Sequence, residues 1–234
     1  MDSGLYEGAA SMQALAKAQD TLAFNLANAS TIGFKRRGMT MGAFERQLRA
    51  QASGPATMPM PRLREAIDFR QGAIASTGNP LDLAIDGPGF FQIETPRGIR
   101  YVRGGTFVPT ADGALVDASG DHLVLDGGRI DPKLPVAISE TGELSQKDQR
   151  VGRIPLVDVA DPSRLVAESA TRFRNAGTSE RPTTARVRAG ALEQSNAEPV
   201  DLLVSMIVVS RAFESSQRAV RTLDERLQRT STGG

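Results

Sequence analysis

Apolar residues recur in alternating steps of three and four along the first part of the chain. A spacing of about 3.5 residues predicts a helix that buries one face against another helix. We expect this helix over residues 4–29, because Asp2 and Ser3 can cap its start and Gly33 follows its end. Six of the eight seam positions are apolar, and the seam reads Leu5, Gly8, Met12, Leu15, Gln19, Leu22, Leu26 and Ala29.

The last part of the chain repeats this pattern with fewer interruptions. Pro199 suits the first turn of a helix, and Ser195 and Asn196 lie just upstream as candidate caps. A second long helix is therefore predicted from about Pro199 toward the C-terminus. Seven of its eight seam positions are apolar, and the seam reads Leu202, Met206, Val209, Phe213, Ser216, Val220, Leu223 and Leu227.

Between the two predicted helices, short apolar runs alternate with turn sequences. Residues 83–93 and 99–107 are rich in β-forming side chains, while Asp112-Gly113 and Ser119-Gly120 are typical of hairpin turns. The spacing of these turns predicts a small antiparallel β domain. The predicted fold class is α+β, with long N- and C-terminal helices that form a coiled-coil-like pair and a central, mostly antiparallel β domain.

A stretch of different character separates the first helix from the β domain. It contains the basic run 35–37, a short helix predicted over residues 43–50, and a stretch rich in proline and methionine at 55–61. We interpret it as an extended connector. The predicted organisation is an N-terminal helix and turn (1–34), the connector (35–67), the β domain with a polar return segment (68–188) and a C-terminal helical segment (189–234).

The two seams favour a structural subunit of a larger assembly over an enzyme. Ordering a residue costs roughly 1 to 2 kcal/mol of backbone entropy, and an isolated helix is marginal in water. A large apolar side chain contributes about 1.5 to 3 kcal/mol when fully buried, so pairing of the helices offsets much of this cost. The pair would still leave flanking faces for other subunits. The alternative is a helical hairpin that packs only on the β domain of its own chain.

Composition narrows the choice of partners and chemistry. The chain has 234 residues, of which 40% are hydrophobic, so it can bury a substantial core. Lys and Arg number 28 against 27 Asp and Glu, and this net charge of +1 predicts no nucleic-acid partner. Cysteine is absent. No run of about 18 apolar residues and no Sec-type signal sequence stand out, so we expect neither a membrane span nor Sec-dependent export.

Candidate chemical groups are few. His122 is the only histidine, and we expect it in an exposed turn without a metal or catalytic partner. Asp82 and Asp86 could be imagined as a carboxylate pair for glycoside hydrolysis, but aspartate at strand ends usually forms local hydrogen bonds. The glycine-rich turns lack the Lys-Ser/Thr that a phosphate loop needs. No catalytic residue, cofactor site or metal site is therefore predicted.

Three motifs resemble the bacterial flagellar rod and hook family. Residues 25–36 are similar to the N-terminal signature of that family, residues 81–107 to the opening strands of its β module, and residues 190–213 to its C-terminal region. Together these motifs cover most of the chain in the order the family has. The helix-end residues that the resemblance singles out are Asn25, Asn28, Thr31, Gly33, Phe34 and Lys35, with Ser195 and Asn196 before the C-terminal helix.

Elementary chemistry gives the N-terminal motif a structural meaning. Asn28 can satisfy backbone groups at a helix end, and Gly33 allows a positive φ. Phe34 can then fold back on the seam. We expect the motif to set the angle at which the chain leaves the helix, and Asn196 to play the matching role before the C-terminal helix.

The resemblance implies a structural subunit of the flagellar basal-body rod in the periplasm. Its partners would be other rod subunits, both homologous axial proteins and its own copies, and the flagellar type III apparatus would export it without a Sec signal. The N-terminal sequence, with Leu5-Tyr6, and the short length of the chain favour the proximal rod, with the distal rod as the alternative. Two functions outside the rod stay open, namely a periplasmic glycan-binding β module that dimerises through its helices and a periplasmic hydrolase.

Overall fold

The computed structural model describes residues 3–39 and 65–232. They belong to two compact units, which we call the helical unit and the β unit. The helical unit contains residues 1–27, 37–66 and 197–234, and the β unit contains residues 28–36 and 67–196. The helix predicted over 43–50 and the stretch 55–61 lie outside the described residues.

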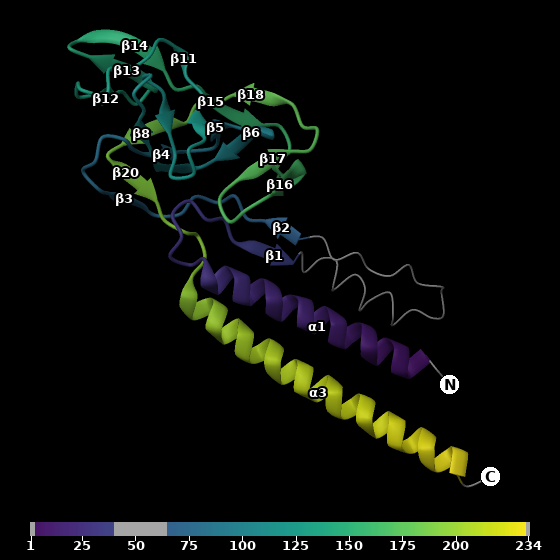
Figure 1. Cartoon of the computed structure of the whole chain (residues 1–234). Coiled ribbons are helices and arrows are strands. Elements are labelled where there is room, and N and C mark those ends of the chain that lie inside the picture. The colour runs from purple at the N-terminus through teal and green to yellow at the C-terminus, as the bar shows by residue number, and fades with distance from the viewer. Residues whose placement is uncertain (1–2, 40–64, 233–234) are drawn as a thin grey trace. The chain divides into compact units, whose positions relative to one another are not determined.

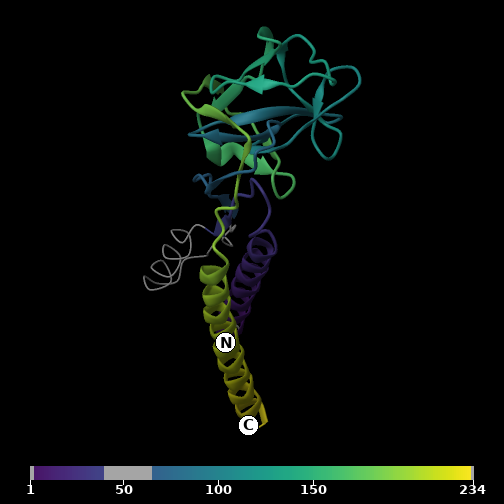
Figure 2. The same ribbon diagram turned by 90° about the vertical axis from the view of Figure 1, so that its left-hand side faces the viewer.

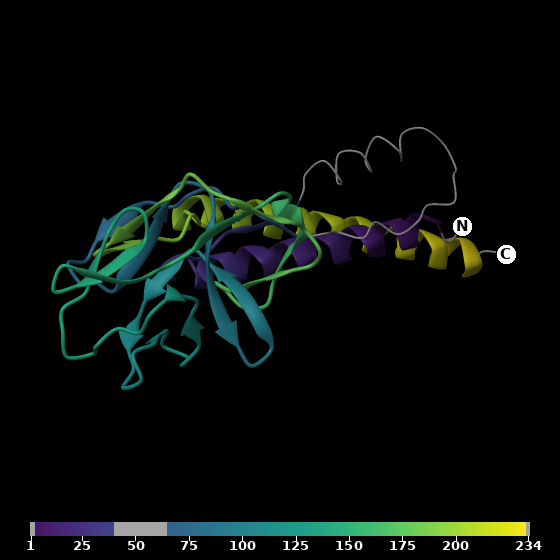
Figure 3. The same ribbon diagram turned by 90° about the horizontal axis from the view of Figure 1, so that it is seen from above.

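The helical unit is built on two long helices that run antiparallel, side by side (Figures 1 and 2). Helix α1 spans Ser3–Ala27 and helix α3 spans Pro199–Thr232. Both helices are where the heptad patterns predict them, and α1 ends two residues before the predicted boundary. A view along a perpendicular direction shows the same pairing (Figure 3).

Gly8 and Val220 establish the register of the pair. A Cβ atom on Gly8 would lie 2.5 Å from Cγ2 of Val220, so the two predicted seams face each other at this point. Both helices rise about 1.5 Å per residue. Because the helices are antiparallel, Leu26 lies as many residues after Gly8 on α1 as Leu202 lies before Val220 on α3. Leu26 and Leu202 are therefore level with each other. The structure thus confirms the predicted coiled-coil-like pair.

The middle of the chain consists of short strands, and every pairing among the strands β3 to β20 is antiparallel. The predicted fold class is therefore confirmed. Two further strands, β1 (Arg37–Met39) and β2 (Glu65–Ile67), form a separate two-stranded sheet. The strands of the first half are β3 (Ile74–Ser76), β4 (Asp82–Asp86), β5 (Phe90–Thr95), β6 (Gly98–Val102), β7 (Gly104–Thr106), β8 (Val108–Pro109), β9 (Leu115–Val116), β10 (His122–Leu123) and β11 (Asp126–Gly127).

The second half contains the return strands. They are β12 (Ala137–Ile138), β13 (Glu143–Gln146), β14 (Gln149–Arg153), β15 (Leu156–Val159), β16 (Leu165–Ala167), β17 (Phe173–Asn175), β18 (Glu180–Pro182), β19 (Arg186–Ala189) and β20 (Ala191–Glu193), with a short 3-10 helix at Pro162–Arg164. Residues 189–198, which the pattern groups with the C-terminal helix, instead hold strand β20 and the approach to α3. The helix begins only at Pro199, whose fixed φ suits a first turn.

Strand β5 organises the largest sheet, which has nine strands. It pairs with β6 along one edge, while β15 and β10 share the other edge. Smaller sheets have the strand orders β11-β14-β13-β12, β19-β4-β7 and β20-β3. The last two sheets join the ends of the unit, because β4 pairs with β19 and β3 pairs with β20.

Alternation along β5 produces two hydrophobic cores, because successive side chains of a strand face opposite sides. Phe91 and Ile93 belong to the larger core, with Leu83, Ile85 and Leu144. The other face of β5 contributes to the smaller core, which contains Phe90, Tyr101, Val159, Leu165 and Phe173.

Candidate functional site

The predicted seam of α3 turns toward α1. Leu202 is buried, the other large apolar seam side chains that the structure describes are partly buried, and the polar seam residue Gln19 is exposed. The partly buried set comprises Met206, Val209, Phe213 and Val220 on α3, and Met12, Leu15, Leu22 and Leu26 on α1. The structure does not describe the side chains of Leu5, Leu223 and Leu227. The helices therefore cover much of the seam within one chain.

A second apolar surface on α3 stays exposed, and we call it the outer stripe. Its members follow steps of three, one, three and one, which is the spacing of a single helix face. They are Val200, Leu203, Val204, Ile207 and Val208, with exposed fractions of 70, 49, 57, 55 and 61%. A single heptad seam drawn through the sequence misses this stripe. The nearly continuous apolar run of residues 202–209, broken only by Ser205, was the sign that α3 has two apolar faces.

The outer face of α1 is of a different kind, because its exposed positions are alanines interspersed with polar side chains such as Gln13 and Asp20. Ala9, Ala16 and Ala23 are exposed at steps of seven, and Ala27 follows. Alanine at these positions leaves the helix backbone open to close approach by a neighbouring helix. Together, the two helices present one bulky apolar face and one face on which alanines alternate with polar side chains.

Asn25 closes the turn after α1 within the helical unit. Its Nδ2 donates to the backbone carbonyl of Arg37 at 2.6 Å, and the N–H of Arg37 donates to its Oδ1 at 2.8 Å. The amide thus pairs with the backbone as a neighbouring strand would. The guanidinium of Arg37 also lies 4.1 Å from the ring centre of Phe24. Residue 37 is thereby held beside the last turns of α1.

The rest of the N-terminal motif lies in the β unit. The N–H of Thr31 donates to the carbonyl of Asn28 at 3.0 Å, and the hydroxyl of Thr31 donates to Oδ1 of Asn28 at 3.2 Å. Gly33 has the expected positive φ, at 70°, and its N–H donates to the carbonyl of Glu193 at 2.7 Å. Phe34 is fully buried. The turn thus leads directly to the C-terminal motif.

Asn196 ties three segments of the β unit together. Its Oδ1 accepts from the N–H of Arg36 at 2.7 Å, and its Nδ2 donates to the carbonyls of Asp68 at 2.8 Å and Arg70 at 2.9 Å. Its own N–H donates to the carbonyl of Phe34 at 3.4 Å. The side chain is therefore engaged with Arg36, Asp68 and Arg70, and the first turn of α3 begins three residues later.

Residues 28–36, 67–73 and 190–196 meet here, and we call this meeting point the junction of the β unit. A buried ion cluster lies beside it. Nζ of Lys35 lies 2.6 Å from Oε1 of Glu193, and Nε of Arg103 lies 2.9 Å from Oε2 of the same carboxylate. All three side chains are almost completely buried. Only Lys35 among them is a predicted site residue. Glu193 and Arg103 lie inside the motifs that resemble the flagellar family, and charged residues that directly follow apolar runs were the available sign.

Backbone groups complete the cluster. Lys35 also donates to the carbonyl of Arg70 at 2.6 Å, and the N–H of Gly72 donates to Oε1 of Glu193 at 2.9 Å. Arg103 donates to the carbonyls of Ile85, Gly87 and Gly89 at 3.2, 2.9 and 2.6 Å. Among the described residues, no buried side-chain nitrogen or oxygen lacks a partner. Burial lowers the pKa of the Lys35 ammonium, although Glu193 acts in the opposite direction.

The two aspartates considered for hydrolysis do not form a catalytic pair. Asp82 and Asp86 stand at opposite ends of β4, about 13 Å apart at 3.3 Å per residue, whereas a glycosidase needs carboxylates within about 10 Å. Asp82 accepts from Nδ2 of Asn79 at 2.9 Å, and Asp86 accepts from Arg188 at 2.9 Å. The bond of Asp82 is local, as expected for aspartate at a strand end, whereas the partner of Asp86 lies 102 residues away on β19.

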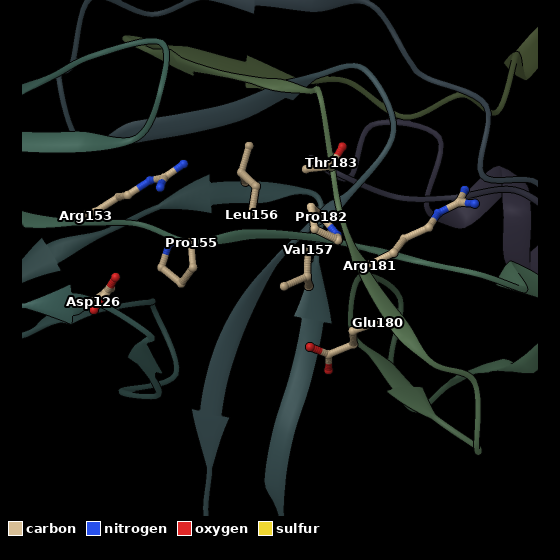
Figure 4. A pocket seen from close by; sticks show the side chains of 9 residues that line it. All are labelled: Asp126, Arg153, Pro155, Leu156, Val157, Glu180, Arg181, Pro182 and Thr183. Atoms are coloured by element: carbon tan, nitrogen blue, oxygen red, sulfur yellow. The ribbon is translucent and has the colours of Figure 1, made fainter.

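Other chemistry is sparse in the part of the chain that the structure describes. There, no group of three or more His, Cys, Asp or Glu side chains is placed to hold a metal ion. His122 is exposed, as expected, but it lies on strand β10 and not in a turn. A cavity of about 420 Å³ is lined by residues of the paired strands β15 and β18, together with Asp126 and Arg153 (Figure 4). Two charged groups on it already have partners, because Arg181 pairs with Asp158 at 2.7 Å and Glu180 accepts from Gln92 at 3.1 Å.

Three family models match successive parts of the chain. They are the flagella basal body rod protein over residues 5–35, the flagellar hook protein FlgE/F/G D1 domain over 84–146, and the flagellar basal body rod FlgEFG protein C-terminal region over 188–232. Within the described residues, no helix is long and apolar enough to cross a membrane.

Whole proteins show the same similarity. The flagellar basal-body rod protein FlgF of Caulobacter vibrioides is 36% identical over 229 residues, covering 92% of this chain and 91% of the relative. FlgF of Mesorhizobium japonicum is 33% identical, with 94% and 93% covered. The flagellar basal-body rod protein FlgG of Bacillus subtilis is 32% identical, with 96% of each chain covered.

Proposed function

The chain belongs to the flagellar basal-body rod protein family and is a structural subunit of the rod, and we propose that its place is the proximal rod, where α1 and α3 pack with other axial subunits to transmit torque. The identities of 36% and 33% to two relatives named FlgF support this place. The 32% identity to FlgG of Bacillus subtilis is the observation behind the alternative, the distal rod.

The outer stripe of α3 is the observation that carries the packing proposal. Full burial of a large apolar side chain contributes about 1.5 to 3 kcal/mol, and roughly half of each stripe side chain is still exposed. Covering the whole stripe would therefore contribute on the order of 4 to 9 kcal/mol. Association costs about 4 to 15 kcal/mol, so one such contact is marginal. Several simultaneous neighbours, as in a tube of subunits, would make the packing stable.

The outer face of α1 suits the same kind of packing. The small side chains at Ala9, Ala16 and Ala23 permit a neighbouring helix to approach closely. The neighbours would be homologous axial proteins and other copies of this chain. A rod built in this way transmits torque through many short helix contacts, none of which is strong alone.

The stripe can be tested against a matched loss of apolar surface elsewhere. Leu203→Ser with Ile207→Ser removes two exposed side chains from α3, and Val108→Ser with Val166→Ser removes two exposed side chains from the β unit. Because all four are exposed, we expect the unfolding free energy of each variant to stay within about 1 kcal/mol of the wild type. The α3 variant should lose incorporation into basal bodies and motility.

Two outcomes would count against the packing proposal. One is normal incorporation of the α3 variant, and the other is an equal loss in the β-unit control. Position along the rod has its own test, which is complementation of strains that lack FlgF or FlgG. Rescue of the strain without FlgG, and not of the strain without FlgF, would replace the proximal place by the distal one.

We also propose, from family membership, that the flagellar type III apparatus exports the subunit to the periplasmic part of the basal body. Export should then continue when Sec-dependent secretion is blocked and stop in a strain without the type III apparatus. Fractionation of cells that carry an epitope-tagged chain measures this. Export that needs Sec would contradict the proposal and leave the packing of the helices untouched.

A further inference from the structure

Among the described residues, Glu193 is the anion that directly contacts two buried cations of the β unit. Lys35 and Arg103 contact different oxygens of its carboxylate, at 2.6 and 2.9 Å, and lie 158 and 90 residues away along the chain. The cluster has two positive charges and one negative charge. Its excess positive charge faces the carbonyl oxygens of Arg70, Ile85, Gly87 and Gly89.

Each member of the cluster arrives on a different segment. Lys35 follows the turn after α1, Arg103 lies between β6 and β7, and Glu193 ends β20. Glu193 also binds the backbone at two further positions, because its carbonyl accepts from Gly33 at 2.7 Å and its Oε1 accepts from Gly72 at 2.9 Å. The first and last segments of the β unit therefore meet at one residue.

Charge arithmetic makes Glu193 different from its partners. Removal of Lys35 leaves a neutral pair, Arg103 with Glu193. Removal of the Glu193 charge leaves two buried cations side by side with no carboxylate in contact with them, and an unpaired buried charge is strongly destabilising. The segments that carry Lys35 and Arg103 can thus close together only when Glu193 is present between them.

We propose that Lys35, Arg103 and Glu193 act as a charge interlock, which closes the junction of the β unit only when its first and last segments are both in place. Residues 28–36 and 190–196 then become ordered together or not at all. These segments directly follow α1 and directly precede α3 in the sequence. An incomplete or mispaired chain would keep its larger core but would leave both segments loose.

The interlock is tested by hydrogen exchange on full-length variants. In Glu193→Gln, amide exchange should accelerate by about 100-fold in residues 28–36, 67–73 and 190–196 together, because a charged hydrogen-bond partner is lost. Exchange in β13 and β14 should stay as in the wild type, since these strands do not contact the cluster. Lys35→Met should accelerate amide exchange in the same three segments by less than about 10-fold, because it leaves Arg103 and Glu193 as a neutral pair.

Glu168→Gln is the matched control. Glu168 also bridges two arginines, Arg100 at 2.6 Å and Arg174 at 3.0 Å, but its side chain is 30% exposed. Loss of its charge should affect amide exchange only near β6, β16 and β17. The double variant Lys35→Met with Glu193→Gln should show slower amide exchange in residues 28–36 and 190–196 than Glu193→Gln alone, since it leaves one unpaired buried cation, Arg103, in place of two.

Several results would overturn the interlock. One is an acceleration of exchange in Glu193→Gln that is confined to residues 190–196. Another is an acceleration in Lys35→Met as large as that in Glu193→Gln. A third is a double variant whose exchange rates show the sum of the two single-variant accelerations. If Glu193→Gln alone does not fold, the interlock requires that the double variant is the more protected of the two against exchange in residues 28–36 and 190–196, because it has one unpaired buried cation in place of two. A double variant that is no more protected than Glu193→Gln contradicts the interlock.

Discussion

The buried charge of Lys35 makes the stability of the β unit depend on pH. The ammonium faces the carboxylate of Glu193, with Arg103 and Asp68 as the other charged neighbours, and burial lowers its pKa below the usual 10.5. Between the lowered value and about 10.5, the unfolded chain binds more protons than the folded chain. The free energy of unfolding therefore gains a contribution that rises with pH across this window.

Lys35→Met removes this contribution. We expect the unfolding free energy of the wild type minus that of Lys35→Met to increase as the pH is raised from neutral toward about 10.5. Urea denaturation at several pH values measures the difference, and the other titrating groups largely cancel because both proteins have them. A difference that stays constant or decreases with pH would show that burial does not lower the pKa of the Lys35 ammonium.

At the scale of the element, Gly8 is the closest approach that we identify between α1 and α3. A methyl group there would lie 2.5 Å from Cγ2 of Val220, whose branched side chain has little freedom in a helix. Replacement of glycine by alanine in an open helix stabilises it by about 1 kcal/mol. Overpacking costs about 1 to 3 kcal/mol, so the clash should cancel or exceed the gain.

We therefore expect Gly8→Ala to leave the helical unit no more stable than the wild type, and to destabilise it by up to about 2 kcal/mol. Thermal unfolding followed by far-ultraviolet circular dichroism measures this. Val220→Ala provides room, so Gly8→Ala should stabilise the chain in that background. If Gly8→Ala raised the stability by about 1 kcal/mol in the wild-type background, the two helices would not meet at this point.

At the scale of the whole molecule, the β unit ends at Asn196 and α3 begins at Pro199. In each hydrogen bond that holds the ion cluster and Asn196 in place, both the donor and the acceptor lie within residues 28–36 or 67–196. The β unit should thus be separable from α3 at a sharply defined position.

Two truncations test this boundary. A chain that ends at Glu198 retains Glu193 and Asn196, so its β unit should keep the exchange protection of the wild type. A chain that ends at Gly190 loses β20 and the carboxylate, and its junction should exchange at least about 100-fold faster while Phe91 and Leu144 stay protected. Equal protection in both truncated chains would mean that β20 contributes nothing to the closure of the unit.

Much of the architecture was readable from local pattern. Heptad spacing located both helices, and alternation with turn residues indicated an antiparallel β domain, because the periods of 3.6 and 2.0 residues follow from backbone geometry alone. Gly33 was assigned a positive φ for the same local reason, since only glycine adopts it without strain. The structure adds that Gly8, the weak position of the first seam, is where Val220 packs.

Other features depend on which distant segments meet. The sequence of α3 contains two apolar faces, and only the tertiary structure decides that Leu202 faces α1 while Ile207 stays exposed. The pairing of β20 with β3 joins residues more than 110 positions apart.

The ion cluster is the clearest case of this division. Lys35, Arg103 and Glu193 are each ordinary in their own sequence context. Periodicity describes neighbours along the chain and carries no information about two charges that are 158 residues apart. The sequence by itself thus determined the helices, the strands and the family motifs. Only the fold, through the cost of burying an unpaired charge, decided which residues hold those motifs together.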